Sequence, residues 1–208
     1  GARKQYLLYT DRNAVQAPLQ YSLCRYCLSM FCHRPFLVGA GQLSDLEIRS
    51  ASHALAPVWG GHLLEHSCKE NPIEILASLS KEEEGLVTLL GDPGTYYLNR
   101  GSWLESLAAW RKPTILIAAT SITGELSGCA PAYAALCESL AVPLVGIIQV
   151  GGNWNPVTRR LDGLPWCGWL PCDSQADVQD GENRSHSEKM MTTEIVLLLR
   201  RRIMKLNL

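Results

Sequence analysis

Four potential metal ligands lie close together near the start of the sequence. Cys24 and Cys27 have two residues between them, and Cys32 and His33 follow after four more. Two thiolates at this spacing can reach one tetrahedral zinc ion, so the cluster is a candidate metal site. No second Cys-x2-Cys pair follows in the sequence to complete the usual set of ligands. The alternative is a buried helix on which each cysteine packs as a small apolar side chain.

Three histidines, His53, His62 and His66, form a second group with metal-binding side chains. On a helix, the spacing of His62 and His66 would place both imidazoles on one face, with Glu65 between them in sequence. The pattern is not His-Glu-x-x-His, and no third ligand is evident. We therefore expect surface or packing roles for these histidines.

Glycine and acidic residues follow two short apolar runs. The segment 39–41 is a Gly-x-Gly motif, but Ser44 stands where a dinucleotide fingerprint has its third glycine, which favours a simple turn. Asp11 comes just after the apolar run 5–10. It would either face a ligand at the end of a strand or cap a turn together with Asn13.

Composition and charge exclude several classes of protein. The chain has 208 residues, of which 47% are hydrophobic, enough for one sizeable core. Its 19 basic and 20 acidic residues give a net charge of −1, which offers no electrostatic basis for binding nucleic acid or a membrane surface. No apolar run approaches the roughly 20 residues that span a bilayer, and no signal-peptide pattern precedes Asp11. We expect a cytoplasmic protein whose 8 cysteines are reduced.

The candidate residues are positioned by strands and helices, which the sequence predicts from short apolar runs that alternate with helical patterns. Short apolar runs predict buried strands at 5–10, 35–39, 85–91, 113–119, 142–150 and 164–170. Helical spacing predicts helices at 19–33, 43–56, 72–80, 102–110, 130–140 and 188–206, and a polar segment, 172–187, predicts a mobile loop. Ser44 and Glu47 form a capping-box pattern, and Asn71 is a predicted helix cap.

This alternation predicts a single α/β domain over 1–208, with a mostly parallel central sheet between two layers of helices. The run 113–119 is rich in β-branched residues and has apolar residues at both odd and even positions, as in a central strand covered on both faces. Ligands bind such sheets beyond the carboxyl ends of the strands. We therefore expect any site in the loops after residues 10, 39, 91, 119 and 150.

The order of elements, and above all the segment 112–150, resembles the dethiobiotin synthetases within the P-loop NTPase superfamily, which includes the ParA/MinD and cobyrinate-synthase groups. The resemblance implies a P-loop NTPase-like fold and a homodimer. It places the phosphate loop at 9–18 and a purine contact at 151–156, where Asn153 would hydrogen-bond a base and Trp154 would stack on it. A simple turn is the alternative there. The nucleotide-contacting residues that it implies are Thr10, Asn13, Gln16, Gly124, Asn153 and Trp154.

The sequence departs from this family at the positions that bind phosphate. Gln16 falls at the lysine of the phosphate loop and Ala17 at its metal-binding threonine, and the segment 9–18 has no glycine. Backbone curvature and the lysine charge are what hold a triphosphate. Leu90 falls at the family's metal-linked glutamate, with Asp92 two residues further on.

Our functional hypothesis is a degenerate, non-catalytic relative of dethiobiotin synthetase that acts as a regulatory, scaffolding or assembly protein, through a homodimer or a protein partner. Two alternatives remain open. One is an ATP- and Mg²⁺-dependent ligase of the dethiobiotin type that uses Asp11, Arg12 and Asp92 in altered roles. The other is a metal-binding module built on Cys24, Cys27, Cys32 and His33.

Overall fold

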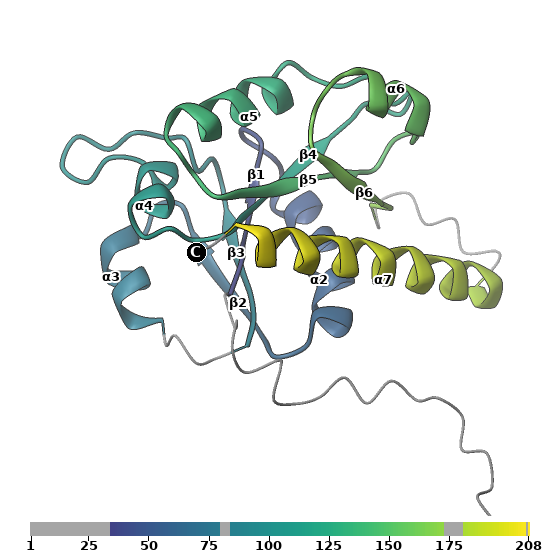
Figure 1. Ribbon diagram of the computed structural model, residues 1–208, viewed down its shortest axis with the longest axis horizontal. Helices are drawn as coiled ribbons and strands as arrows, with labels where there is room; N and C mark the ends of the chain where they lie inside the picture. The colour runs from purple at the N-terminus through teal and green to yellow at the C-terminus, as the bar shows by residue number, and fades with distance from the viewer. Residues whose placement is uncertain (1–33, 80–83, 173–180, 207) are drawn as a thin grey trace, which may run out of the picture. The chain divides into compact units, whose positions relative to one another are not determined.

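The computed structural model describes residues 34–79, 84–172, 181–206 and 208, which form one parallel α/β domain. Its strands are β1 (Phe36–Gly39), β2 (His62–Ser67), β3 (Gly85–Leu90), β4 (Thr114–Ala119), β5 (Leu144–Val150) and β6 (Trp166–Leu170). They form a six-stranded sheet in the order β2-β3-β1-β4-β5-β6, and every neighbouring pair is parallel. Figure 1 shows the strands lying between the helices.

Two groups of helices cover the two faces of this sheet (Figure 1). On one face, α2 (Asp45–Trp59) and α7 (Gly181–Lys205) share a hydrophobic core with Leu37 and Ile117. On the other, α3 (Pro72–Ser78), α4 (Trp103–Ala109) and α5 (Cys129–Ser139) share a second core with Phe36 and Val38. The short helix α6 (Pro156–Leu161) connects β5 to β6. The three-layer α/β arrangement predicted from the sequence is therefore confirmed for the described residues.

Side-chain caps explain where several helices begin. Ser44 and Glu47 form the predicted capping box at the start of α2, and Asn71 caps α3 as predicted. Ser102 and Glu105 form a second capping box at α4. Each box satisfies backbone N–H groups that have no partner within the helix.

The sequence prediction was wrong about three elements. Residues 62–67 form strand β2, where no strand was predicted. No helix was predicted at 156–161, but this segment forms α6 with Asn155 as its cap and Pro156 in its first turn. Helix α7 begins at Gly181, before the predicted start at Glu188, so residues 181–187 are helical and not part of a loop. Residues 181–187 are polar and give no apolar periodicity from which a helix start could be read.

The predicted strand 5–10 and helix 19–33 lie outside the described residues. Whether the whole of 1–208 forms a single domain therefore stays a prediction. No helix among residues 34–79, 84–172 and 181–206 is both long enough and apolar enough to span a membrane.

The direction of the connections locates the crevice of the sheet. β1 leads into α2 on one face, whereas its neighbours β3 and β4 lead into α4 and α5 on the opposite face. Connections that diverge in this way leave a crevice at the carboxyl ends of the strands. Among the described strands, the crevice lies at the end of β1.

Candidate functional site at the carboxyl edge of the sheet

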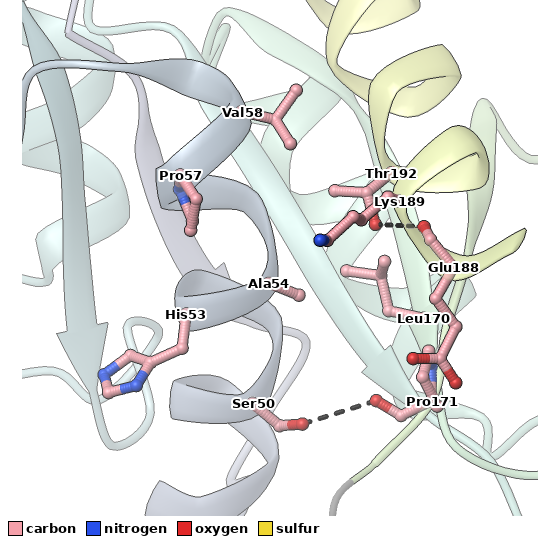
Figure 2. Close-up of a pocket in the computed structure, with 10 residues that line it drawn as sticks. All are labelled: Ser50, His53, Ala54, Pro57, Val58, Leu170, Pro171, Glu188, Lys189 and Thr192. Atoms are coloured by element: carbon pink, nitrogen blue, oxygen red, sulfur yellow. Dashed lines mark hydrogen bonds between the residues drawn. The ribbon is translucent and has the colours of Figure 1, made fainter. Parts of the chain in front are cut away.

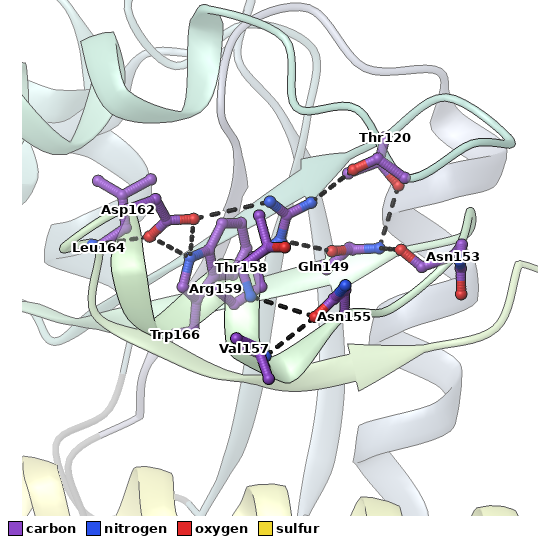
Figure 3. A network of polar contacts seen from close by, with 11 residues as sticks. Thr120, Gln149, Asn153, Asn155, Val157, Thr158, Arg159, Asp162, Leu164 and Trp166 are labelled. Carbon is purple, nitrogen blue, oxygen red and sulfur yellow. Dashed lines mark hydrogen bonds and ion pairs between the residues drawn. The ribbon is translucent and has the colours of Figure 1, made fainter.

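The loops after β4 and β5 are joined by a buried polar network around Gln149, which Figure 3 shows. The Gln149 side chain has no solvent exposure. Its amide nitrogen lies 3.1 Å from Thr120 Oγ1, 3.0 Å from the Gly151 carbonyl oxygen and 3.2 Å from the Asn153 carbonyl oxygen. One side chain thus ties two loops together. We call residues Thr120, Gly124, Gln149, Gly151, Asn153 and Arg159 the Gln149–Arg159 network.

Arg159 on α6 supplies the charge in this network. Its Nε donates to Gln149 Oε1 over 2.9 Å, and its Nη2 donates to the Gly124 carbonyl oxygen over 2.8 Å. Asp162 lies 3.6 Å away as an ion-pair partner, and the guanidinium stacks 5.0 Å from the Trp166 ring centroid. A buried guanidinium is tolerated only when its donors and charge are matched in this way. The contacts of Arg159 therefore serve to hold loops in place.

Two glycines in these loops allow close backbone contact. Gly124 has φ +85°, and a Cβ at this position would overlap the Asn153 carbonyl oxygen. Gly152 has φ +61°, and a Cβ there would overlap Thr120 Oγ1 and the Ser121 carbonyl oxygen. The loops after β4 and β5 thus pack backbone to backbone, which no larger residue would permit.

The structure brings together three of the residues implied to contact a nucleotide. Gly124 and Asn153 are in direct backbone contact, and the next residue, Trp154, packs edge-on against Trp166 with ring centroids 6.1 Å apart. The Asn153 contact in the network uses its backbone oxygen, so its side-chain amide is not consumed by that contact. The base-binding role of these residues stays a prediction.

Asp92, the candidate acid that falls within the described residues, is engaged in two internal hydrogen bonds. Its Oδ1 accepts from the Gly94 backbone N–H over 2.8 Å and from the Tyr133 hydroxyl on α5. The first bond closes the turn after β3, and the second attaches that turn to α5. Burial, together with the nearby Asp92 carboxylate, raises the pKa of the Tyr133 hydroxyl. The hydroxyl is thus held protonated as the donor to Asp92.

Two cysteines, Cys68 and Cys129, lie near the Asp92–Tyr133 pair. Burial and the Asp92 charge raise the pKa of the Cys68 thiol to about 12, which leaves it protonated and unreactive. Cys129, the first residue of α5, is exposed. A Cβ added to Gly41 would lie 3.4 Å from Cys129 Sγ and 3.7 Å from Tyr133 Cε2. The Gly-x-Gly segment therefore makes the close turn that the sequence favoured, against the start of α5.

The N-terminus of α2, the helix that follows the crevice strand β1, is closed by its own side chains. Ser44 Oγ accepts from the Glu47 N–H over 3.2 Å, and Glu47 Oε2 accepts from the Ser44 N–H over 2.9 Å. Asp45 adds a second carboxylate in the first turn. Negative side chains at this position complement the helix dipole and repel a phosphate.

A pocket of about 350 Å³ lies between α2 and α7 (Figure 2). Ala54, Pro57, Val58 and Leu170 form its apolar wall. Ser50 donates to the Pro171 carbonyl oxygen over 3.3 Å at one end. The pocket has the size of a small-ligand site, but its polar residues do not converge on one point of the apolar wall (Figure 2).

His62 and His66 lie on strand β2 rather than on a helix, so the helical spacing does not apply to them. Four residues along a strand separate them by about 13 Å. His66 instead lies 3.4 Å from Glu70, and Glu65 forms a bidentate pair with Arg49 at 2.6 and 2.9 Å. That guanidinium hydrogen bond lowers the pKa of Glu65. No group of three metal-binding side chains occurs within the part of the chain that the structure describes.

The remaining predicted site residues lie outside the described residues. They are Thr10, Asp11, Arg12, Asn13, Gln16, Cys24, Cys27, Cys32 and His33. Conversely, sequence reasoning missed Tyr133, Gln149 and Arg159. Only Gln149 left a signal, as a polar residue within the apolar run 142–150.

Fold and site together define a parallel α/β domain with a structured crevice at the end of β1. Compared with known proteins, the chain matches no protein-family model and no curated protein. The structure therefore supports a parallel α/β fold and identifies no family.

Proposed function

We propose that this protein is a non-catalytic relative of the P-loop NTPases, of the dethiobiotin synthetase type, that acts as a regulatory, scaffolding or assembly protein. The observation that carries the proposal is the closed N-terminus of α2. Ser44 and Glu47 consume each other's backbone N–H groups, and two carboxylates occupy the first turn. Phosphoryl transfer depends almost entirely on positioned positive charge, whereas the first turn of α2 carries two carboxylates.

The state of Asp92 supports the same proposal. A metal-binding or catalytic carboxylate needs an oxygen directed at its ligand. In Asp92, the Oδ1 oxygen accepts both hydrogen bonds, which close the turn after β3 and join it to Tyr133. Leu90, which aligns with the family's metal-linked glutamate, ends strand β3 with an aliphatic side chain. At 9–18, where the resemblance places the phosphate loop, the sequence contains neither lysine nor glycine.

Phosphate release from ATP tests this proposal. The full-length chain with Mg²⁺ and ATP is expected to release phosphate no faster than the buffer. Dethiobiotin formation from diaminopelargonate, CO₂ and ATP is also expected to be absent. Turnover in either assay that is lost in Asp92→Asn would overturn the proposal in favour of the ligase. Stoichiometric zinc in the purified protein, lost in Cys24→Ala, would instead favour the metal-binding module.

A further inference from the structure

The outward side of α7 carries a line of apolar side chains. Met190, Leu197 and Met204 are 58%, 54% and 63% exposed. The opposite side of the same helix holds Ile195, Val196, Leu199 and Ile203, which are buried in the core against the sheet. The helix is thus anchored along one side while large apolar groups line the other.

These three residues recur at intervals of seven. Positions seven apart lie almost directly above one another on a helix, so the side chains form one stripe about 21 Å long. Glu194 and Arg201 are exposed and lie between them, three residues before and four residues after Leu197. Apolar and charged residues thus alternate along one face of α7 at three- and four-residue spacing.

We propose that this stripe, Met190–Leu197–Met204 with Glu194 and Arg201, binds the same stripe of a second copy of the chain in an antiparallel pair of α7 helices. A two-fold axis near Leu197 places Leu197 against the partner's Leu197 and Met190 against the partner's Met204. The same axis places Glu194 of each copy beside Arg201 of the other, which gives two equivalent ion pairs. A parallel pair would set glutamate against glutamate and arginine against arginine, which is unfavourable.

The contacts of the neighbouring arginines show why Arg201 is the one available for pairing. Arg200 donates to the Trp59 carbonyl oxygen and stacks 5.2 Å from the Trp59 ring centroid. Arg202 donates to the Val145 and Pro165 carbonyl oxygens over 3.2 and 2.9 Å. Both therefore brace α7 against the rest of the fold. Arg201 is exposed on the stripe, where its charge faces the position of an incoming helix.

This inference specifies the dimer surface without depending on the absence of catalysis. If the chain hydrolyses ATP, the proposed function is overturned but the α7 pair is not. If the chain is monomeric and inactive, the α7 pair is overturned but the proposed function is not. Sedimentation equilibrium of the full-length protein measures the dimer directly. We expect a reversible dimer whose dissociation constant rises at least about tenfold in Leu197→Glu. The matched control is Ile73→Glu on α3, which is similarly exposed at 54% and should leave the constant unchanged.

Charge reversal tests the antiparallel arrangement. Glu194→Arg and Arg201→Glu should each weaken the dimer, and the double variant should restore it, because the pair is then reversed rather than broken. Circular dichroism of every variant confirms that folding is retained. The inference is overturned if the wild-type chain is a monomer at all concentrations, if Leu197→Glu dimerises as well as Ile73→Glu, or if the double variant is weaker than both single variants.

Discussion

Arg159 Nε donates to Gln149 Oε1 over 2.9 Å between two buried side chains, one on α6 and the other on β5. Through this bond and the donors on either side of it, the loops after β4 and β5 become one unit (Figure 3). The polar groups of the Gln149–Arg159 network are hydrogen-bonded to one another and to the backbone of both loops.

Removing the amide should be costly. Gln149→Leu leaves the buried Arg159 Nε without its acceptor and removes the donor shared by three oxygens. We expect the free energy of unfolding to fall by about 2–4 kcal/mol, the range for an orphaned buried charge and its lost hydrogen bonds. Urea denaturation measures this. Arg160→Met, on the same helix but exposed, is the control and should change stability by less than about 0.5 kcal/mol.

Glycine substitutions separate backbone strain from close contact. Gly152→Ala and Gly163→Ala both place an alanine at positive φ, +61° and +73°, but only the first would overlap neighbouring atoms. We expect Gly163→Ala to lower the free energy of unfolding by about 1 kcal/mol and Gly152→Ala by at least about 2 kcal/mol more. Equal effects of the two substitutions would mean that the loops after β4 and β5 are not in close contact.

Loss of the Tyr133 hydroxyl should loosen the turn after β3. Tyr133→Phe removes one of the two donors to Asp92 Oδ1 while it preserves the ring. A hydrogen bond to a charged acceptor contributes about 1.5–3 kcal/mol, so thermal unfolding should occur at a lower temperature. Tyr96→Phe, 65% exposed, is the matched control and should leave the midpoint unchanged. An unchanged midpoint in Tyr133→Phe would contradict a structural role for Asp92.

Stability should fall at alkaline pH because of buried thiols. Burial raises the pKa of Cys137 from 9.0 to about 12. Between these values the unfolded chain ionises the thiol while the folded protein keeps it protonated, so the free energy of unfolding decreases as pH rises through this window. Urea titrations at several pH values should show a slope that is shallower in Cys137→Ala, by up to about 1.4 kcal/mol per pH unit. Cys129→Ala, at an exposed position, should keep the wild-type slope.

Local signals predicted the framework well. The run 113–119 became the central strand β4 because its residues are apolar on both faces, and the Ser44–Glu47 pattern marked the start of α2 because capping depends only on nearby residues. Strand β2 was not predicted from the sequence. It lies at an edge of the sheet and is only partly buried, and it lacks the alternation that marks a half-buried strand. Asn155-Pro156 is a helix-start signature that was interpreted as a turn.

The candidate site was harder to predict because its contacts join distant parts of the chain. Asp92 and Tyr133 meet only after β3 and α5 pack on the same face of the sheet. Gln149 and Arg159 meet only when α6 folds back over the end of β5. Neither pair has a spacing that a sequence pattern could reveal. The predictions for residues 1–33 concern a part of the chain that the described structure does not include.

Calorimetric titration of the 208-residue chain with ATP in the presence of Mg²⁺ is the decisive experiment for the proposal that this protein does not bind a triphosphate. We predict no saturable heat at ligand concentrations up to about 1 mM, the weak limit of ordinary nucleotide recognition. Saturable binding with micromolar affinity, lost on competition with inorganic triphosphate, would show that the chain still holds a phosphate chain and would contradict the account.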